Sequence, residues 1–161
     1  MDNENVLREQ LLELLRGGHA HMRLMEAVEH FPMTLINAPL ANSEYTAWRL
    51  LEHIRIAQWD IVEFTRNPQH VSPPWPIAYW PPVGKTAGPR EWEATLAGVR
   101  SDLQAMLALV ADPQTDLAAP LPHAPGYSVL REVLVLADHN AYHLGEFGML
   151  RQMIEAQKTA G

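Results

Sequence analysis

The sequence predicts an all-α fold, an antiparallel four-helix bundle with a long proline-rich connection between helices two and three. Apolar residues recur at helical spacing in four long segments, and no segment shows the strict alternation that marks a β-strand. The chain has 161 residues, 47% of them hydrophobic, which is enough for one well-buried core. We therefore expect residues 1–161 to form a single domain.

The first helix is expected over about residues 4–30, where leucines and methionines recur at helical spacing. The pair Gly17-Gly18 lies in the middle of this segment. Two glycines inside a helix cost about 1 kcal/mol each relative to alanine. The helix either bends there or packs closely against another backbone, and we favour a weak point that the helix tolerates.

The second helix is expected to follow residues 31–42, whose prolines and asparagines break the helical pattern. Ser43 or a neighbour would cap it, and it would run to about Arg66. His53 and Asp60 lie on or beside its apolar stripe. Polar groups at such positions need partners, because burying them without hydrogen bonds is costly.

Residues 67–88 form the long connection, with six prolines in 22 residues and the aromatic group Trp75, Tyr79 and Trp80. A solvated linker seldom carries two tryptophans so close together. We expect an ordered crossover that packs over one end of the core. Its segment from Trp75 to Trp80 would shape the pocket of any nearby site.

The third helix is expected to begin at Pro89, which suits a first helical turn, and to end at Asp112-Pro113. A second proline-rich connection follows over residues 113–126. Ser128 is the expected N-cap of the last helix, which would cover about residues 129–157.

Three histidines stand out against this helical pattern. His139 and His143 are four residues apart, so both rings lie on one helical face and reach one ion. His53 lies among core-facing positions of a helix that can face them. Burying three imidazoles without a shared partner would leave several polar atoms unsatisfied, and one divalent ion such as zinc or nickel resolves them together. A three-ligand site would leave positions open for water or substrate.

Two familiar metalloenzyme classes do not fit these histidines. Asn140 stands where an HExxH protease carries its glutamate base, and no Glu-x-x-His pair of the di-iron type is present. Four roles are open for Glu146 and Asp60: a further ligand, an acceptor from a ring N–H, a general base, or a solvated or ion-paired group at the rim of the bundle. We favour the rim for both. The remaining histidines are expected to be surface or capping residues: His19, His21, His30, His70 and His123.

The composition excludes other classes of protein. A net charge of −7 and a pI near 5.5 argue against nucleic acid as a partner. The N-terminal residues show no secretion signal, and no stretch is apolar over the length of a membrane span, so we expect a cytoplasmic protein without membrane contact. The absence of cysteine excludes disulfides, cysteine ligands and a cysteine nucleophile.

The sequence Leu-Leu-Glu-His-Ile around His53, followed near the C-terminus by Ala-Asp-His-Asn-Ala-Tyr-His-Leu-Gly-Glu, resembles the DinB/YfiT-like superfamily of metal-binding four-helix bundles. The resemblance covers nearly the whole chain. It implies that His53, His139 and His143 form the family's three-histidine site, with nickel or zinc usual and water completing the shell. It also implies a homodimer, and chemistry like that of members that transfer low-molecular-weight thiols such as bacillithiol or mycothiol.

Two functions remain open on these grounds. The first is a metal-dependent enzyme, a thiol transferase or hydrolase, in which the ion activates the thiol of a small-molecule substrate or water. The second is a non-catalytic, metal-stapled dimeric helical bundle, a stress-related binding or structural module. An open coordination position facing a pocket would favour the enzyme, and a closed fourth ligand such as Glu146 would favour the structural module.

Overall fold

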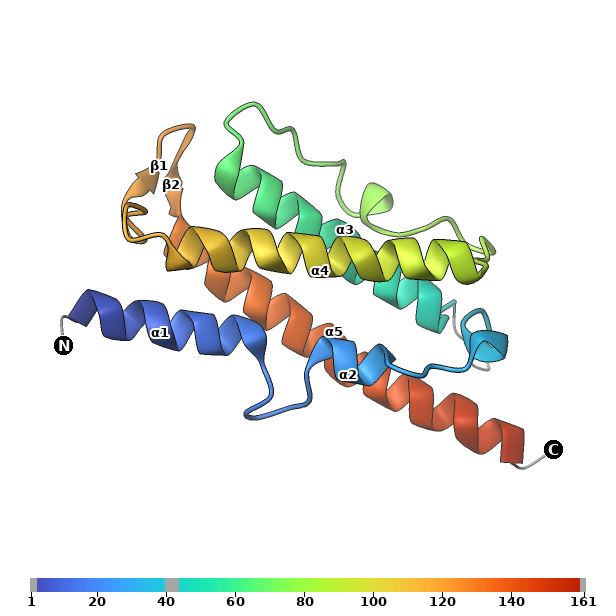
Figure 1. Cartoon of the computed structure of the whole chain (residues 1–161). Helices are drawn as coiled ribbons and strands as arrows, with labels where there is room; N and C mark the ends of the chain where they lie inside the picture. Colours follow the sequence, from blue (N-terminus) through green and yellow to red (C-terminus); the bar gives the residue numbers. More distant parts are fainter. Residues whose placement is uncertain (1–2, 40–43, 160–161) are drawn as a thin grey trace.

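The computed structural model describes residues 3–39 and 44–159, and these residues are mainly helical, as the sequence predicts (Figure 1). The α-helices of the described residues are α1 (Asn3–Arg16), α2 (Leu24–Val28), α3 (Ala47–Arg66), α4 (Pro89–Ala111) and α5 (Val129–Thr159). Two short 3-10 helices, η1 (Met33–Leu35) and η2 (Ile77–Tyr79), lie in the connections. A small antiparallel hairpin of β1 (Pro120–Leu121) and β2 (Ala124–Ser128) precedes α5, and the sequence pattern did not predict it.

Helices α3 and α4 run in the same direction, whereas α1 and α5 run the opposite way (Figure 1). Near the start of α3, the indole N–H of Trp48 donates to Thr95 Oγ1 at 3.3 Å. Further along both helices, the side-chain amide of Gln58 donates to the carbonyl of Val99 at 2.6 Å. Residues 67–88 must therefore carry the chain back along the helices, which explains the length of this connection. The antiparallel arrangement expected from the sequence describes α3 with α5 but not α3 with α4.

The first helix differs from the prediction. Instead of one helix over about residues 4–30, α1 ends at Arg16 and α2 begins only at Leu24. Gly17 and Gly18 have φ angles of +64° and +91°, which glycine adopts without the steric cost that other residues meet. The N–H of Gly17 still donates to the carbonyl of Glu13 at 3.1 Å, and the chain then leaves the helix. The expectation of a tolerated weak point was wrong, because the glycine pair terminates the helix.

The other helix ends follow the local sequence. Thr46 Oγ1 accepts from the N–H of Arg49 at 3.1 Å and caps α3, while the suggested cap Ser43 lies outside the described residues. Ser128 Oγ accepts from the N–H of Arg131 at 3.2 Å, as an N-cap of the last helix does. Helix α4 begins at Pro89 as predicted.

The buried apolar residues that the structure describes form two clusters. One lies between α2, α3, α4 and α5 around the fully buried Leu51 and Phe147, and the other joins α1, α3, α4, α5 and the hairpin around Met106 and Leu136. On α3 and α5 a layer of polar side chains separates the two clusters. There the side chain of Asn140 donates to Gln58 Oε1 at 2.8 Å. The three histidines of interest lie beside this layer, where α3 and α5 face each other.

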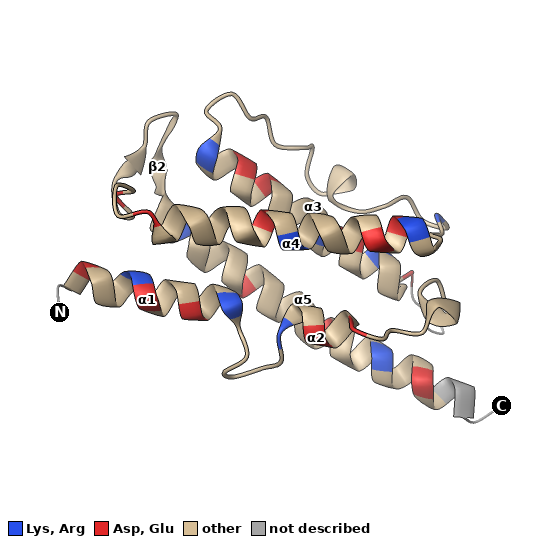
Figure 2. Cartoon of the chain, in the orientation of Figure 1, with Lys and Arg blue, Asp and Glu red and all other residues tan. Residues whose placement is uncertain are grey.

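Figure 2 shows acidic and basic residues interspersed along the helices. Among the residues that the structure describes, no helix is apolar over enough of its length to cross a bilayer.

Candidate metal centre

The structure brings together all three histidines that the sequence singled out. His53 comes from α3, and His139 and His143 come from α5. The Nε2 atom of His53 lies 3.1 Å from Nε2 of His143 and 3.3 Å from Nε2 of His139. One ring nitrogen from each residue lies within 4.8 Å of the others. Three nitrogen atoms at this separation can hold a single metal ion.

The outer nitrogen atoms of two rings show which nitrogen carries the proton. Nδ1 of His53 is 2.8 Å from the carbonyl oxygen of Tyr79, and Nδ1 of His143 is 2.7 Å from a carboxylate oxygen of Glu146. Because these oxygens accept hydrogen bonds, the proton of each neutral ring belongs on Nδ1. The two Nε2 atoms then point their lone pairs at each other across 3.1 Å. Lone pairs in this arrangement repel unless a cation or proton lies between them.

Burial keeps two of the rings, those of His53 and His139, in the neutral form that binds metal ions. Burial lowers the pKa of His53 from 6.5 to about 4, and the hydrogen bond to Tyr79 only partly offsets this. Burial also lowers the pKa of His139 to about 4, with further lowering by the neighbouring histidines. Both side chains are therefore neutral at pH 7.

Glu146 orients His143. Its carboxylate accepts from Nδ1, which leaves Nε2 of the same ring directed at the other histidines. The side chain of Glu146 is 35% exposed, so it also reaches solvent. Of the roles that the sequence left open for Glu146, the structure shows the acceptor from a ring N–H at the rim of the site.

Asp60 lies away from the histidines. Its carboxylate accepts from Nε2 of His70 at 2.7 Å and from the hydroxyl of Tyr79. Burial and Asp60 together raise the pKa of Tyr79 to about 12. The prediction of a surface or capping role for His70 was wrong, because its side chain is 7% exposed and fastens residues 67–88 to α3.

Trp80 covers the histidine cluster. Its ring stacks on His53 with 3.7 Å between the centroids and 3° between the planes. The guanidinium of Arg49 lies 5.5 Å from the Trp80 ring, and its Nε donates to the carbonyl of Pro81 at 3.0 Å. The connection thus shapes the site, as the sequence suggested, and Trp80 also packs against the core cluster around Leu51 and Phe147.

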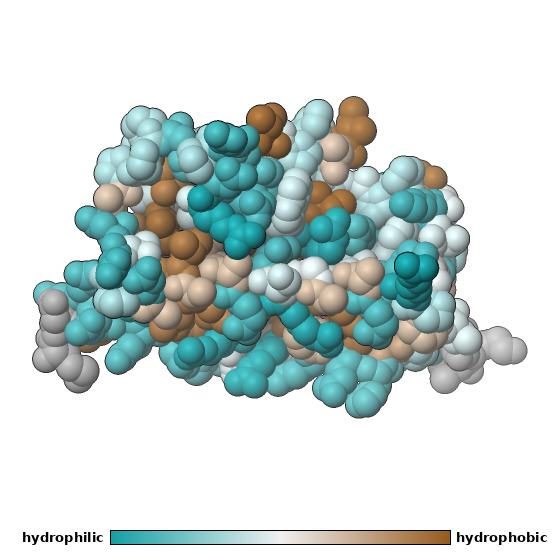
Figure 3. All heavy atoms as spheres, turned by 45° about the horizontal axis from the view of Figure 1, so that its top comes forward, coloured by the Kyte–Doolittle hydropathy of each residue, from teal (hydrophilic) through white to brown (hydrophobic). Residues whose placement is uncertain are grey.

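The outer part of the same connection is exposed. Trp75 is 72% exposed, and Val71 and Ile77 are exposed at 85% and 84%. Figure 3 shows apolar groups at the surface on the face of the molecule that is turned forward there. The aromatic group of this connection is therefore divided, because Tyr79 and Trp80 pack on the bundle whereas Trp75 lies mostly at the surface.

Two tyrosines flank the cluster on its outward side, and the sequence reading did not select them. Tyr142 lies 4.9 Å from His143 between ring centroids, and Tyr45 lies 5.4 Å from Trp80. Both are at least 40% exposed, at 64% and 41%. Tyr142 stands within the motif His-Asn-Ala-Tyr-His, one residue before His143, which was the available signal.

The fold and the site together define the general class of this protein. It is a helical protein in which two helices bring three imidazoles within reach of one metal ion. The sequence model of the DinB superfamily matches residues 7–147, a range that includes all three histidines, and the chain belongs to this superfamily. No match was found among curated proteins or among solved structures.

Proposed function

We propose that His53, His139 and His143 hold one divalent metal ion, nickel or zinc, in a four-helix-bundle metalloenzyme that acts on a small molecule. The observation that carries the proposal is the convergence of three Nε2 atoms, with that of His53 lying 3.1 Å from that of His143 and 3.3 Å from that of His139. In His53 and His143 the opposite ring nitrogen, Nδ1, has an oxygen partner and carries the proton. Imidazole is a ligand that nickel and zinc both favour.

Three protein ligands leave coordination positions for substrate or water. A bound ion of this kind lowers the pKa of a thiol or water placed there, which suits thiol transfer or hydrolysis. Because the chain contains no cysteine, the thiol in such a reaction belongs to a substrate of low molecular weight. Of thiol transfer and hydrolysis, the resemblance to the DinB-like family favours thiol transfer.

The surrounding residues have separate tasks in this proposal. The carbonyl of Tyr79 and the carboxylate of Glu146 set the orientation of His53 and His143. Trp80 keeps water from the face of His53 on which it stacks. The partly exposed carboxylate of Glu146 is the group that we assign to accepting a proton from the substrate.

We also propose that the chain forms one domain and works as a homodimer in the cytoplasm. Leu7 and Leu14 on α1 are 37% and 46% exposed, which gives this helix apolar surface for a second copy. Light scattering coupled to size exclusion measures the assembly directly. A monomeric mass at micromolar concentration would refute the dimer.

The first experiment is the metal content of untagged protein by elemental mass spectrometry. We expect about one nickel or zinc per chain in the wild type, and loss of the metal in His53→Ala and His143→Ala. His19→Ala is the matched control, because the His19 side chain is 68% exposed. Protein that stays metal-free after metal is added would refute the proposal.

A second experiment separates the enzyme from a metal-stapled structural module. Metal-loaded protein is mixed with a low-molecular-weight thiol and an electrophile, and loss of the thiol is followed. Turnover that disappears in His143→Ala supports the enzyme. A lower melting temperature in His143→Ala, with no turnover in the wild type across a panel of thiols, would instead favour the structural module.

A further inference from the structure

The break between α1 and α2 opens a cleft on the side of α5 that faces away from the histidines. Residues 17–23 leave the helical path, so the layer that one continuous helix would have formed is interrupted (Figure 1). Leu15 of α1 and Leu24 of α2 border the cleft at either side of the interruption, and Leu103 and Ala141 line it from α4 and α5. Its volume is about 640 Å³, within the range of small-molecule sites.

The inner wall of the cleft is apolar with a small polar group. Apolar side chains of α1, α2, α4 and α5 supply most of the lining, and Gln58 and Asn140 also border it. The two amides are already hydrogen-bonded to each other at 2.8 Å. Such a wall favours an apolar chain over a sugar or a nucleotide, which would leave several polar groups without partners.

The charged residues around the cleft are mostly cationic. Arg16, Arg23 and Arg100 line it, and Asp138 is the one acidic residue among the described residues that line it. This excess contrasts with the whole chain, which has 12 basic and 19 acidic residues. Figure 2 shows basic segments at the end of α1 and just before α2, on both sides of the interruption.

The three arginines are not equally engaged. Arg16 pairs with Glu13 at 3.2 Å, and Arg23 lies 3.9 Å from Glu26. Arg100 forms no ion pair or hydrogen bond through its side chain with the residues that the structure describes. Its guanidinium is therefore available to an anionic group.

We propose that this cleft binds an amphipathic carboxylate. The apolar chain lies against Leu103 and Ala141, and the carboxylate pairs with Arg100 at the edge. The site is separate from the histidine cluster, because His139 and His143 project from the other side of α5 and do not line the cleft. Binding is expected in metal-free and metal-loaded protein alike.

Isothermal titration with decanoate tests the proposal on the full chain. We expect one decanoate per chain, and much weaker binding of decyltrimethylammonium, which has the same apolar chain and the opposite charge. Arg100→Gln should weaken decanoate binding about tenfold, as the loss of a charge-assisted hydrogen bond does. The matched control is Arg90→Gln, an exposed arginine on the same helix that does not line the cleft.

A second variant fills the cleft. Ala137→Phe adds a ring where Ala137 lines it and should abolish decanoate binding while the metal content stays unchanged. Equal affinity for the cationic analogue, or decanoate binding unaffected by Ala137→Phe or by Arg100→Gln, would overturn the proposal. If circular dichroism shows that Ala137→Phe does not fold, the comparison of decanoate binding by Arg100→Gln and Arg90→Gln still tests the proposal.

Discussion

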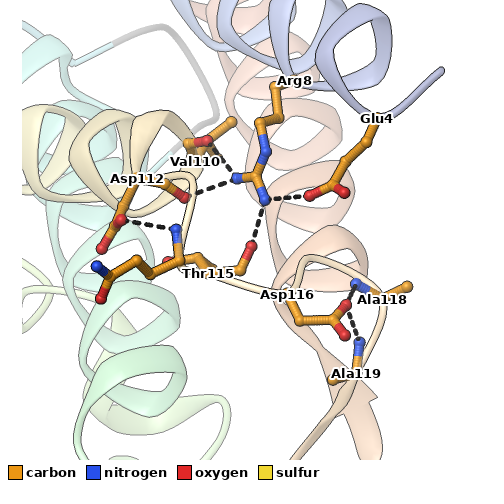
Figure 4. Close-up of polar contacts among 9 residues, drawn as sticks. Glu4, Arg8, Val110, Asp112, Thr115, Asp116, Ala118 and Ala119 are labelled. Carbon is orange, nitrogen blue, oxygen red and sulfur yellow. Dashed lines mark hydrogen bonds and ion pairs between the residues drawn. The ribbon is translucent and has the colours of Figure 1, made fainter. Parts of the chain in front are cut away.

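Two buried polar centres of this molecule contrast in how their hydrogen bonds are completed. At the first, Arg8 of α1 is 7% exposed and donates from Nη1 to the carbonyls of Val110 and Asp112 at 2.9 and 2.8 Å. Its Nη2 donates to the carboxylate of Glu4 and to the carbonyl of Thr115 (Figure 4). The guanidinium thus joins α1 to the end of α4 with partners that all belong to the chain.

In the histidine cluster, by contrast, not every polar group has a hydrogen-bond partner. His53 and His143 have partners for Nδ1, but their Nε2 atoms face each other. Nδ1 of His139 is buried and has no hydrogen-bond partner among the described residues. A polar centre that stabilises the fold satisfies its own groups, whereas lone pairs that face each other beside a buried ring nitrogen without a partner indicate a place for a ligand.

The largest effect is expected at Arg8. Arg8→Met leaves three buried or partly buried carbonyls without their donor, and we expect it to lower the free energy of unfolding by about 3 kcal/mol. Urea unfolding measures the change. The control Arg16→Met removes an exposed ion pair with Glu13 and should cost under about 1 kcal/mol. Equal losses of unfolding free energy in the two variants would show that the buried hydrogen bonds of Arg8 contribute no more than an exposed ion pair.

The metal should complete the second centre and so stabilise the chain. At a free nickel or zinc concentration about 100 times Kd, the free energy of unfolding should rise by about 2.7 kcal/mol. The same addition to His143→Ala should change little, because one of the three ligands is missing. Thermal unfolding with and without the metal tests this. A rise of the same size in both proteins would show that the ion binds elsewhere.

A smaller effect is expected from Glu146→Gln. The amide keeps the shape of the side chain but is a weaker acceptor for Nδ1 of His143, so metal affinity should fall about tenfold. Metal-free protein should unfold at nearly the wild-type temperature, because the side chain is partly exposed. Competition with a chromogenic chelator measures the affinity, and Glu93→Gln on the exposed side of α4 is the control. Loss of all metal in Glu146→Gln would instead make Glu146 a direct ligand.

The smallest effect concerns Asp102, a buried carboxylate on α4 that belongs to neither centre. Burial raises its pKa, and Arg55 and Arg66 only partly offset this. A carboxyl whose folded-state pKa is raised destabilises the fold as pH rises through that pKa. Asp102→Asn should therefore stabilise the chain at pH 7, by less than about 1 kcal/mol, and have little effect at pH 3. Urea unfolding at both pH values tests the sign, and destabilisation at pH 7 would contradict it.

Much of the helical structure follows from local sequence. Helix α3 ends at Arg66, α4 begins at Pro89, and Ser128 caps α5, all as the sequence predicts. These features depend on residues within a few positions of each other, so an amino-acid sequence carries them directly. The meeting of the three histidines was also foreseeable, because spacing on α5 and a buried position on α3 limit where the rings can point.

Other features depended on contacts between distant segments. The pairing of His70 with Asp60 and the stacking of Trp80 on His53 both require residues 67–88 to fold back along α3. The same direction of α3 and α4 is likewise set by which apolar faces pack together. Even at Gly17-Gly18, the sequence marks a weak point, but only the structure shows that both glycines take positive φ angles and that the helix ends there.

The sequence by itself determined the helical class, the helix ends with strong capping residues, and the three histidines that converge. The tertiary structure alone decided that Tyr79 and Glu146 orient the rings, that Trp80 covers them, and that a cleft opens beside α5. The physical reason is range. Helical periodicity and capping act over a few residues, whereas the partners of a buried side chain come from whichever segments are brought beside it by burial of apolar surface.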